Sequence, residues 1–129
     1  MAKILIVEDD PISLDLSFNI IKKLGHKPVA AKNGREAVEC IRTDLPDAIL
    51  LDVVLPDIEG FQLGKNLKGH PRTRDIPIAY VTGRSNTADF QKGFESGGMI
   101  YLTKPFTPDA LETALSSLLL IPRCKTEDG

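Results

Sequence analysis

The sequence predicts an α/β fold, a parallel β-sheet with helices on both of its faces. Short apolar runs typical of buried strands alternate along the chain with longer segments whose apolar residues recur every three or four positions. Two runs, residues 4–7 and 48–51, consist only of apolar residues, as expected of strands covered on both sides. Both lead directly into acidic residues. In an open sheet of this kind, ligands bind at the carboxyl ends of the strands.

Length and composition favour one globular domain. The chain has 129 residues, of which 42% are hydrophobic and 26% charged, which argues against disorder. No apolar run approaches the roughly 20 residues that cross a bilayer, and the N-terminal segment lacks a signal-peptide layout. The net charge of −2 gives no reason to expect nucleic-acid binding. Cys40 and Cys124 have no metal-like spacing, so we expect free thiols in a reducing cytoplasm and no membrane association.

The chain begins with a predicted strand, Lys3–Val7, followed by a helix. Asp10 is a suitable N-cap, Pro11 suits the first helical position, and Gly25 ends the helix. The apolar face predicted for this helix is a stripe at spacing four, widened by three further residues. Its members are Ile12, Leu16, Ile20 and Leu24, with Leu14, Phe18 and Ile21 beside them.

The second strand and helix follow, and lead to the middle of the predicted sheet. Pro28–Ala31 is a weak strand whose proline suits a sheet edge. Asn33 and Glu36 form a capping box for a helix that Pro46 stops. The apolar face of this helix consists of Ala37, Val38, Ile41 and Leu45. The strand Ala48–Asp52 comes next and ends on a carboxylate.

The second half of the chain predicts three more helices and two more strands. A helix after Gly60 carries Phe61, Leu63 and Leu67, and Ile76–Thr82 is the fourth strand. A fourth helix begins at Asn86 or Asp89, carries Phe90 and Phe94 in its core-facing pattern, and ends at Gly97–Gly98. The strand Met99–Leu102 and a helix from Pro108 that buries Leu111, Ala114, Leu115, Leu118 and Leu119 complete the fold. We expect one domain over residues 1–121 and a tail or linker over 122–129.

Right-handed crossovers between these strands gather five polar side chains at one edge of the sheet: Glu8, Asp9, Asp52, Thr82 and Lys104. Carboxylates this close repel one another unless a cation offsets their charge, and a hard divalent ion such as Mg²⁺ suits oxygen ligands. Lys104 adds a second cation and Thr82 a hydroxyl donor. Such a set favours phosphoryl transfer, with Asp52 as the nucleophile that forms an aspartyl phosphate.

Several polar and aromatic residues have simpler explanations than a functional role. Asp10 suits the positive end of the helix that follows it, rather than a metal. Phe90 and Phe94 suit the core, although one of them on a partner-binding face is the alternative. His26 and His70 are single histidines in predicted loops, and they need no function.

In five places the sequence resembles the receiver domains of two-component response regulators, the family that includes the bacterial chemotaxis regulator. The matching pieces occur in the family's order, and the resemblance covers the chain from residue 3 to about 120. They are residues 4–10, residues 50–52, Pro56 with Gly60, residues 81–83 and residues 101–106. The resemblance implies a doubly wound, flavodoxin-like sheet of five parallel strands in the order 2-1-3-4-5.

The resemblance also implies roles for individual residues. Asp52 would be the phosphoacceptor, and Mg²⁺ (or Mn²⁺) would be held by Glu8, Asp9, Asp52 and the backbone carbonyl of Val54. Thr82 and Lys104 would contact the phosphoryl group, Tyr101 would change its rotamer on phosphorylation, and Pro105 would follow a cis peptide bond. Two positions depart from the family's pattern: Val54, where many relatives have a polar residue, and Arg84. Both should alter the lifetime of the phosphorylated state.

By the same resemblance the chain is a switch, and its only catalysis is its own phosphorylation and dephosphorylation. The phosphoryl donor would be a phosphohistidine of a sensor histidine kinase or phosphotransfer protein, or acetyl phosphate. The face built from the fourth helix, the fifth strand and the last helix would then bind an output partner, an effector domain or a second copy of the chain. The sequence names neither the kinase nor the output.

Two alternatives belong to other functional classes. A magnesium-dependent phosphohydrolase also uses an aspartate at a strand end, but it places a second acid two residues later, where this chain has Val54. A receiver that has lost its chemistry would act as a binding module, for example for a flavin. The intact set of Asp9, Asp52, Thr82 and Lys104 counts against that alternative.

Overall fold

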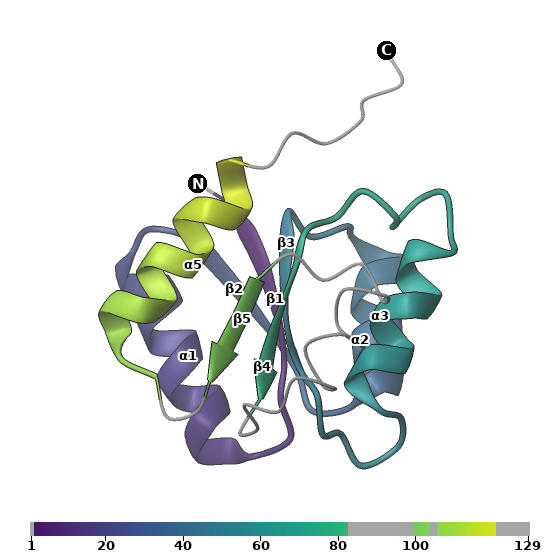
Figure 1. Ribbon diagram of the computed structural model, residues 1–129, viewed down its shortest axis with the longest axis horizontal. Coiled ribbons are helices and arrows are strands. Elements are labelled where there is room, and N and C mark those ends of the chain that lie inside the picture. The colour runs from purple at the N-terminus through teal and green to yellow at the C-terminus, as the bar shows by residue number, and fades with distance from the viewer. Residues whose placement is uncertain (1, 83–99, 104–105, 121–129) are drawn as a thin grey trace.

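Five parallel strands form a single sheet in the computed structural model, which describes residues 2–82, 100–103 and 106–120 (Figure 1). The strands are β1 (Lys3–Val7), β2 (Lys27–Ala31), β3 (Ala48–Asp52), β4 (Ile78–Thr82) and β5 (Ile100–Thr103). Their order is β2-β1-β3-β4-β5, and every neighbouring pair is parallel. The predicted fold class and strand order are therefore confirmed, and β2, with Pro28, lies at an edge of the sheet.

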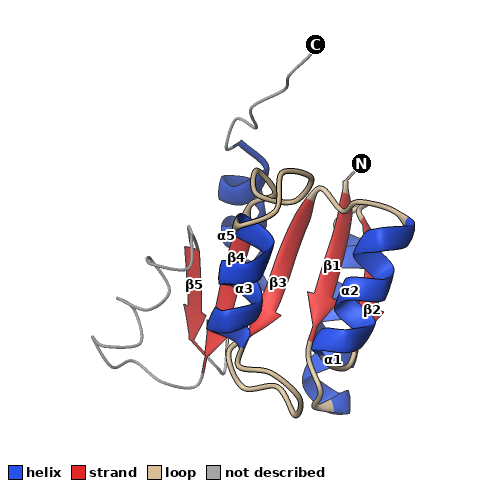
Figure 2. Ribbon diagram, turned by 90° about the vertical axis from the view of Figure 1, so that its right-hand side faces the viewer, coloured by secondary structure: helices blue, strands red, loops and turns tan. Residues whose placement is uncertain are grey.

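Helices cover both faces of this sheet. They are α1 (Pro11–Lys23), α2 (Gly34–Thr43), α3 (Gly60–Lys68) and α5 (Pro108–Leu120). Helices α1 and α5 lie on one face, and α2 and α3 lie on the other (Figures 1 and 2). The predicted helix with Phe90 and Phe94 lies outside the described residues. None of the described helices combines the length and apolarity needed to cross a lipid bilayer.

Alternate residues of the central strands build two separate cores, because successive side chains of a strand point to opposite faces. Ile4, Ile6 and Leu50 pack with residues of α1 and α5. Leu5, Val7 and Leu51 belong to the other core, with residues of α2 and α3. All five residues of β3 are buried. This strand therefore holds Asp52, its last residue, between two packed layers.

The predicted helix ends are also present. The side chain of Asp10 accepts a hydrogen bond from Ser13 N (3.1 Å), as an N-cap does. Gly25 has a φ of +89°, and His26 N donates to Ile21 O in the arrangement that commonly ends a helix at a glycine. These contacts fix where α1 starts and stops, and they place its N-terminus beside the acidic residues after β1.

The capping box of α2 forms with one change. Asn33 Oδ1 accepts from Glu36 N (2.8 Å), as predicted. Glu36 Oε1, however, accepts from Lys32 N (2.9 Å), one residue before the cap. The N-terminus of α2 is therefore held by the side chains of Asn33 and Glu36.

The apolar face predicted for α1 was wrong at two positions. Ile12 is 78% exposed and Leu16 is 48% exposed, while Ser17, Ile20 and Ile21 are buried. A stripe at spacing four turns by about 40° at each step, because a helix has 3.6 residues per turn. The first half of the stripe has therefore rotated out of the face that packs on the sheet.

Smaller differences concern α2 and two strands. Val38 and Leu45 of the predicted α2 face are 38% and 36% exposed, because Val38 lies on the flank of the helix and the helix ends at Thr43. Strand β4 begins at Ile78, two residues later than predicted, although Pro77 O still accepts from Ile49 N of β3. Strand β5 extends to Thr103, one residue past its predicted end.

Candidate functional site

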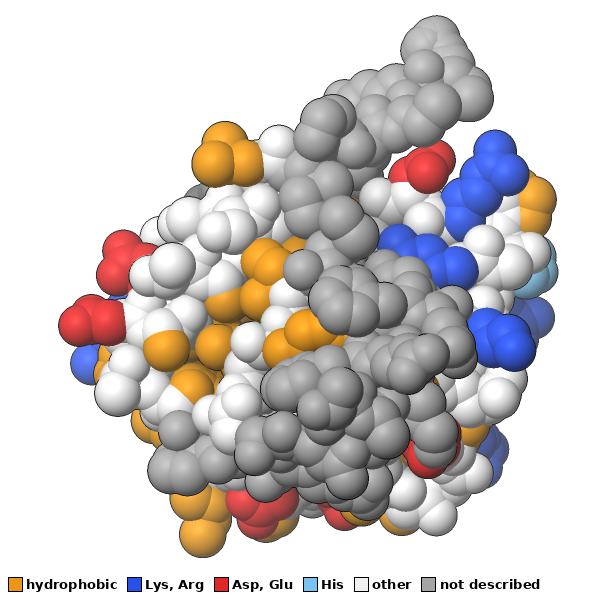
Figure 3. Space-filling model, in the orientation of Figure 1, with side chains coloured by type: hydrophobic (Ala, Val, Ile, Leu, Met, Phe, Trp, Pro, Cys, Tyr) orange, Lys and Arg blue, Asp and Glu red, His pale blue; other side chains and the backbone are white. Residues whose placement is uncertain are grey.

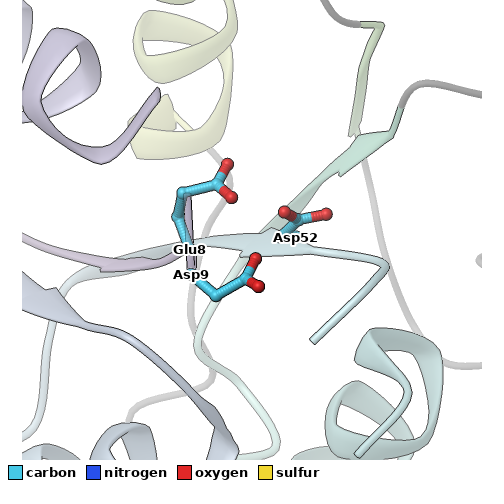
Figure 4. A group of neighbouring side chains, drawn as sticks. All are labelled: Glu8, Asp9 and Asp52. Atoms are coloured by element: carbon cyan, nitrogen blue, oxygen red, sulfur yellow. The ribbon is translucent and has the colours of Figure 1, made fainter. Parts of the chain in front are cut away.

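Three carboxylates meet at the carboxyl ends of β1 and β3. Glu8 and Asp9 directly follow β1, and Asp52 is the last residue of β3. Val7 pairs with Leu51 in the sheet, so the residues after them, Glu8 and Asp52, lie at the same level. One oxygen from each of Glu8, Asp9 and Asp52 can be chosen so that all three lie within 4.8 Å of one another, and the side chains project to one side (Figure 4).

Backbone amides orient two of these carboxylates. Val54 N donates to Asp52 Oδ1 (3.0 Å), and Asp10 N donates to Glu8 Oε2 (3.1 Å). Glu8 is 5% exposed and Asp52 6% exposed, whereas Asp9 is exposed. Asp10 itself caps α1 and is not part of the cluster, in agreement with its predicted role.

The chemistry of this donor set fits a hard divalent cation. Three carboxylates in one small volume concentrate negative charge, and two of them are buried. Carboxylate oxygens are the ligands that Mg²⁺ and Mn²⁺ prefer, and Mg²⁺ usually keeps several waters when it binds to few protein groups. The residues present therefore suit Mg²⁺, with the exposed Asp9 leaving one side of the cluster open to solvent.

Val54, predicted as a ligand through its carbonyl, lies in the loop just past Asp52. Its backbone forms an isolated antiparallel bridge with Glu59, at the other end of the same loop. The side chain of Val54 is 56% exposed. The chain therefore presents an exposed apolar side chain two residues after Asp52.

Thr82 ends the strand next to β3. Asp52 pairs with Val81, so Thr82 lies one residue farther toward the carboxyl edge of the sheet, and it is 2% exposed. Thr82 in turn pairs with Thr103 of β5. Lys104 is the next residue along the chain, but Lys104, Pro105 and Arg84 lie outside the described residues. The structure thus unites Glu8, Asp9 and Asp52 and sets Thr82 on the adjacent strand end.

Tyr101, the predicted switch residue, is half-buried on β5. Its ring stacks on that of Tyr80 at 5.9 Å between centroids and 22° between planes. Tyr80 meets Phe61 edge-on at 4.8 Å, so an aromatic row runs from β5 to α3. Burial raises the pKa of the Tyr101 hydroxyl above its ordinary value, because the charged phenolate loses hydration there.

Two residues that support the site were not given a structural role by the sequence pattern. A Cβ at Gly60 would collide with the backbone of Asp52 and Val53, so only glycine fits against the end of β3. Asp57 Oδ1 accepts from Gly34 N (2.9 Å) and Oδ2 from Arg35 N (3.0 Å). Gly60 could be recognised only as part of a motif, and no local pattern joins Asp57 to a helix start 23 residues away.

Comparison with known proteins agrees with this fold. The sequence model of the response regulator receiver domain matches residues 4–116. The chain therefore belongs to the family of response regulator receiver domains, the signalling modules of two-component systems, for which phosphorylation on an aspartate is characteristic.

Individual relatives share most of this chain. PilH of Pseudomonas aeruginosa is 34% identical over 119 residues, covering 92% of this chain and 98% of PilH. The phosphate regulon regulator PhoB of Escherichia coli is 36% identical over 117 residues, but this chain spans only 51% of PhoB. The receiver domain of the sensor histidine kinase PA1611 from Pseudomonas aeruginosa is 27% identical, with a TM-score of 0.84 over 92% of this chain and 97% of that one. Its crystal structure has a magnesium ion coordinated in the active-site cleft.

Proposed function

We propose that this chain is a phosphorylation-activated switch whose phosphoacceptor is Asp52. The observation that carries the proposal is the convergence of Glu8, Asp9 and Asp52 at the end of a strand that is buried on both faces. A nucleophile fixed in this way loses little freedom when it reacts, and the neighbouring acids provide a place for the cation that phosphoryl transfer requires.

In the proposed reaction a carboxylate oxygen of Asp52 attacks the phosphorus of the donor. The donor is a phosphohistidine of a sensor kinase or phosphotransfer protein, or acetyl phosphate. The new P–O bond forms as the bond from phosphorus to the donor nitrogen or oxygen breaks, and the donor leaves with that electron pair. The amide of Val54 continues to donate its hydrogen bond to Asp52 Oδ1. The hydroxyl of Thr82 and the ammonium of Lys104 contact the phosphoryl oxygens.

Glu8, Asp9, Asp52 and the carbonyl of Val54 would hold Mg²⁺ in this site. When bound, the ion supplies positive charge against the phosphoryl oxygens. The magnesium ion in the PA1611 receiver domain supports this assignment. Attack by water on the phosphorus of phosphorylated Asp52 returns the free carboxylate and inorganic phosphate, and the side chains of Val54 and Arg84 influence how fast this water arrives.

The proposed output surface involves Tyr101. Phosphorylation draws Thr82 toward the new oxygens, and the ring of Tyr101 turns inward into the space released, which changes the surface of β5 and α5. Hydrophobic side chains already gather between α5 and β5 (Figure 3), around a hollow of about 530 Å³. An output protein, an effector domain or a second copy of the chain would bind there.

The test is the intact mass of the protein after incubation with acetyl phosphate. We expect the wild type to gain one phosphoryl group when Mg²⁺ is present and none when the metal is chelated. Asp52→Asn should gain none, whereas Asp10→Asn, which keeps the N-cap of α1, should be labelled like the wild type. Labelling of Asp52→Asn would refute the assignment. Multiple turnover of a small phosphate ester would instead favour a phosphohydrolase. If the wild type were not labelled at all, a binding module would be favoured.

Amide hydrogen exchange tests the switch separately. We expect phosphorylation to change exchange within residues 83–106, a segment that includes β5 with Tyr101. Protection that is the same in the phosphorylated and unmodified protein throughout this segment would rule out the conformational part of the proposal, while the chemistry at Asp52 would stand.

A further inference from the structure

A second concave site lies between α2 and α3, away from the acidic cluster. It encloses about 700 Å³, a volume typical of sites for small molecules. Its floor is made of the buried side chains of Ile41, Leu63 and Leu67, and the half-buried Ile58 and the flank of Val38 form its walls. Neither Glu8, Asp9 nor Asp52 lines it. The trough is therefore apolar inside, and it is separate from the proposed phosphorylation site.

The rim of this trough carries an excess of positive charge. Arg35, Arg42 and Arg72 line it, and all three are exposed. Within the described part of the chain, none of their guanidinium groups takes part in a salt bridge. Figure 3 shows Lys and Arg side chains gathered on the α3 side of the molecule.

Asp57 is the acidic residue that lines the trough, and its charge is already engaged. Its two oxygens accept hydrogen bonds from the backbone amides of Gly34 and Arg35. The amide of Gly34 is the main reason why the pKa of Asp57 lies below its ordinary value. The carboxylate of Asp57 is therefore held by the N-terminus of α2, and within the described residues it forms no salt bridge with the rim arginines.

We propose that the trough between α2 and α3 binds a small amphipathic anion. An apolar body lies over Ile41, Leu63 and Leu67, and an acidic group at its end meets the guanidinium groups of the rim. Guanidinium groups bind carboxylate, sulfonate and phosphate oxygens through paired hydrogen bonds, and an apolar trough rejects a fully hydrated ion such as inorganic phosphate. Binding at this site does not depend on phosphorylation of Asp52. The proposal can therefore be tested independently of the proposed function.

Two fluorescent probes that differ in a single charged group test the proposal. One is 1-anilinonaphthalene-8-sulfonate, and the other is N-phenyl-1-naphthylamine, which lacks the sulfonate. We expect the sulfonate to bind with saturation and to shift the backbone NMR signals of residues 34–42 and 58–73. The uncharged probe should bind at least about tenfold more weakly, the equivalent of one ion-assisted contact.

Variants locate the charge requirement. Combining Arg42→Gln with Arg72→Gln should weaken binding of the sulfonate about tenfold or more and leave the uncharged probe unaffected. Arg74 is exposed and lies two residues after Arg72, but it does not line the trough. Arg74→Gln also removes one positive charge, and it should not change the binding of either probe. Val38→Glu, at an exposed wall position, should abolish sulfonate binding. Circular dichroism confirms that each variant is folded.

Three outcomes would overturn the proposal. The first is the absence of saturable binding of the sulfonate up to about 1 mM, the weak end of specific small-molecule affinity. The second is NMR shifts centred on β5 and α5 instead of the trough. The third is equal binding of the two probes, or equal losses in Arg74→Gln and in the double variant, because either would show that apolar contact or overall charge accounts for the binding.

Discussion

The hydroxyl group of Tyr80 occupies the space that a side chain at Gly64 would need. Tyr80 is fully buried on β4, and a Cβ at position 64 would collide with its oxygen and lie 2.9 Å from Cζ. The same ring stacks on Tyr101. A glycine in α3 therefore sets the depth at which Tyr80 lies, and through the stacked pair it supports the aromatic side chain proposed to report phosphorylation.

Gly64→Ala should therefore destabilise the fold, even though alanine is the better helix former. Overpacking a core costs about 1–3 kcal/mol, whereas the gain in helix propensity is at most about 1 kcal/mol. The buried ring of Tyr80 cannot retreat without disturbing Phe61 and Tyr101, so we expect the collision to dominate. Urea unfolding followed by circular dichroism would measure the difference.

Gly69→Ala, at the C-cap of the same helix, provides the matched control. A Cβ at Gly69 would meet nothing closer than 3.5 Å, and the residue has the φ of a right-handed helix, −80°. This variant should unfold at the urea concentration of the wild type or slightly above it. If Gly64→Ala were as stable as Gly69→Ala, Tyr80 would not be fixed by α3.

Metal binding should stabilise the protein through the acidic cluster. A cation that binds only the folded state at a hundred times its Kd contributes about 2.7 kcal/mol, so chelation of Mg²⁺ should lower Tm. Asp9→Asn, which removes the exposed carboxylate of the cluster, should abolish most of this dependence. Thermal unfolding with and without Mg²⁺ would show it, with Asp10→Asn as a control that keeps the full dependence. If the Tm of the wild type were the same with and without Mg²⁺, this result would contradict the proposed metal site.

The raised pKa of Tyr101 has a consequence for stability in alkali. A raised pKa means that the folded protein binds the phenolic proton more tightly than the unfolded chain does. The resulting stabilisation is complete below the unfolded pKa of about 10, and it is lost as pH rises through the folded pKa. Tyr101→Phe should therefore lose less stability than the wild type above that pH, in urea unfolding from pH 8 to 11. Parallel losses in the two proteins would mean that Tyr101 titrates as an exposed tyrosine.

Asp57 has the opposite pH dependence. Its pKa is lowered, first by the amide of Gly34, so its contribution to stability is present above the unfolded pKa of about 3.9 and disappears as pH falls through the folded value. Asp57→Ala should be less stable than the wild type at neutral pH, and the difference should narrow in acid. Asp15→Ala, at an exposed position of α1, is the control. A difference that stays constant with pH would show that the hydrogen bonds to α2 do not depend on the charge.

Local rules predicted most of this fold, and geometry over longer distances accounts for what they missed. Caps such as Asp10 and Asn33 lie next to the turns they stabilise, and Pro28 marks the sheet edge, so a short window of sequence is sufficient. The exposure of Ile12 depends instead on where the rest of α1 meets the sheet. A spacing rule that ignores the slow rotation of a helical stripe cannot reveal this.

The acidic cluster was predictable because strand ends of a parallel sheet must gather at one edge. Glu8 and Asp52 each close an apolar run, so the topology brings them together without further information. The fit of Gly60 against the backbone of Asp52 and the contact of Gly64 with Tyr80 required coordinates. Each is a close contact between segments that are distant in sequence. The sequence around a helical glycine does not show which side chain or backbone packs against it.

The double hydrogen bond from Asp57 to the start of α2 makes two amide protons into reporters. The amide protons of Gly34 and Arg35 can exchange with solvent only when their hydrogen bonds to Asp57 break. Asp57 lies five residues after Asp52, the last residue of β3. Deuterium uptake at these two amides therefore measures how often the segment after Asp52 opens. An opening of the loop after Asp52 can therefore be followed at the N-terminus of α2.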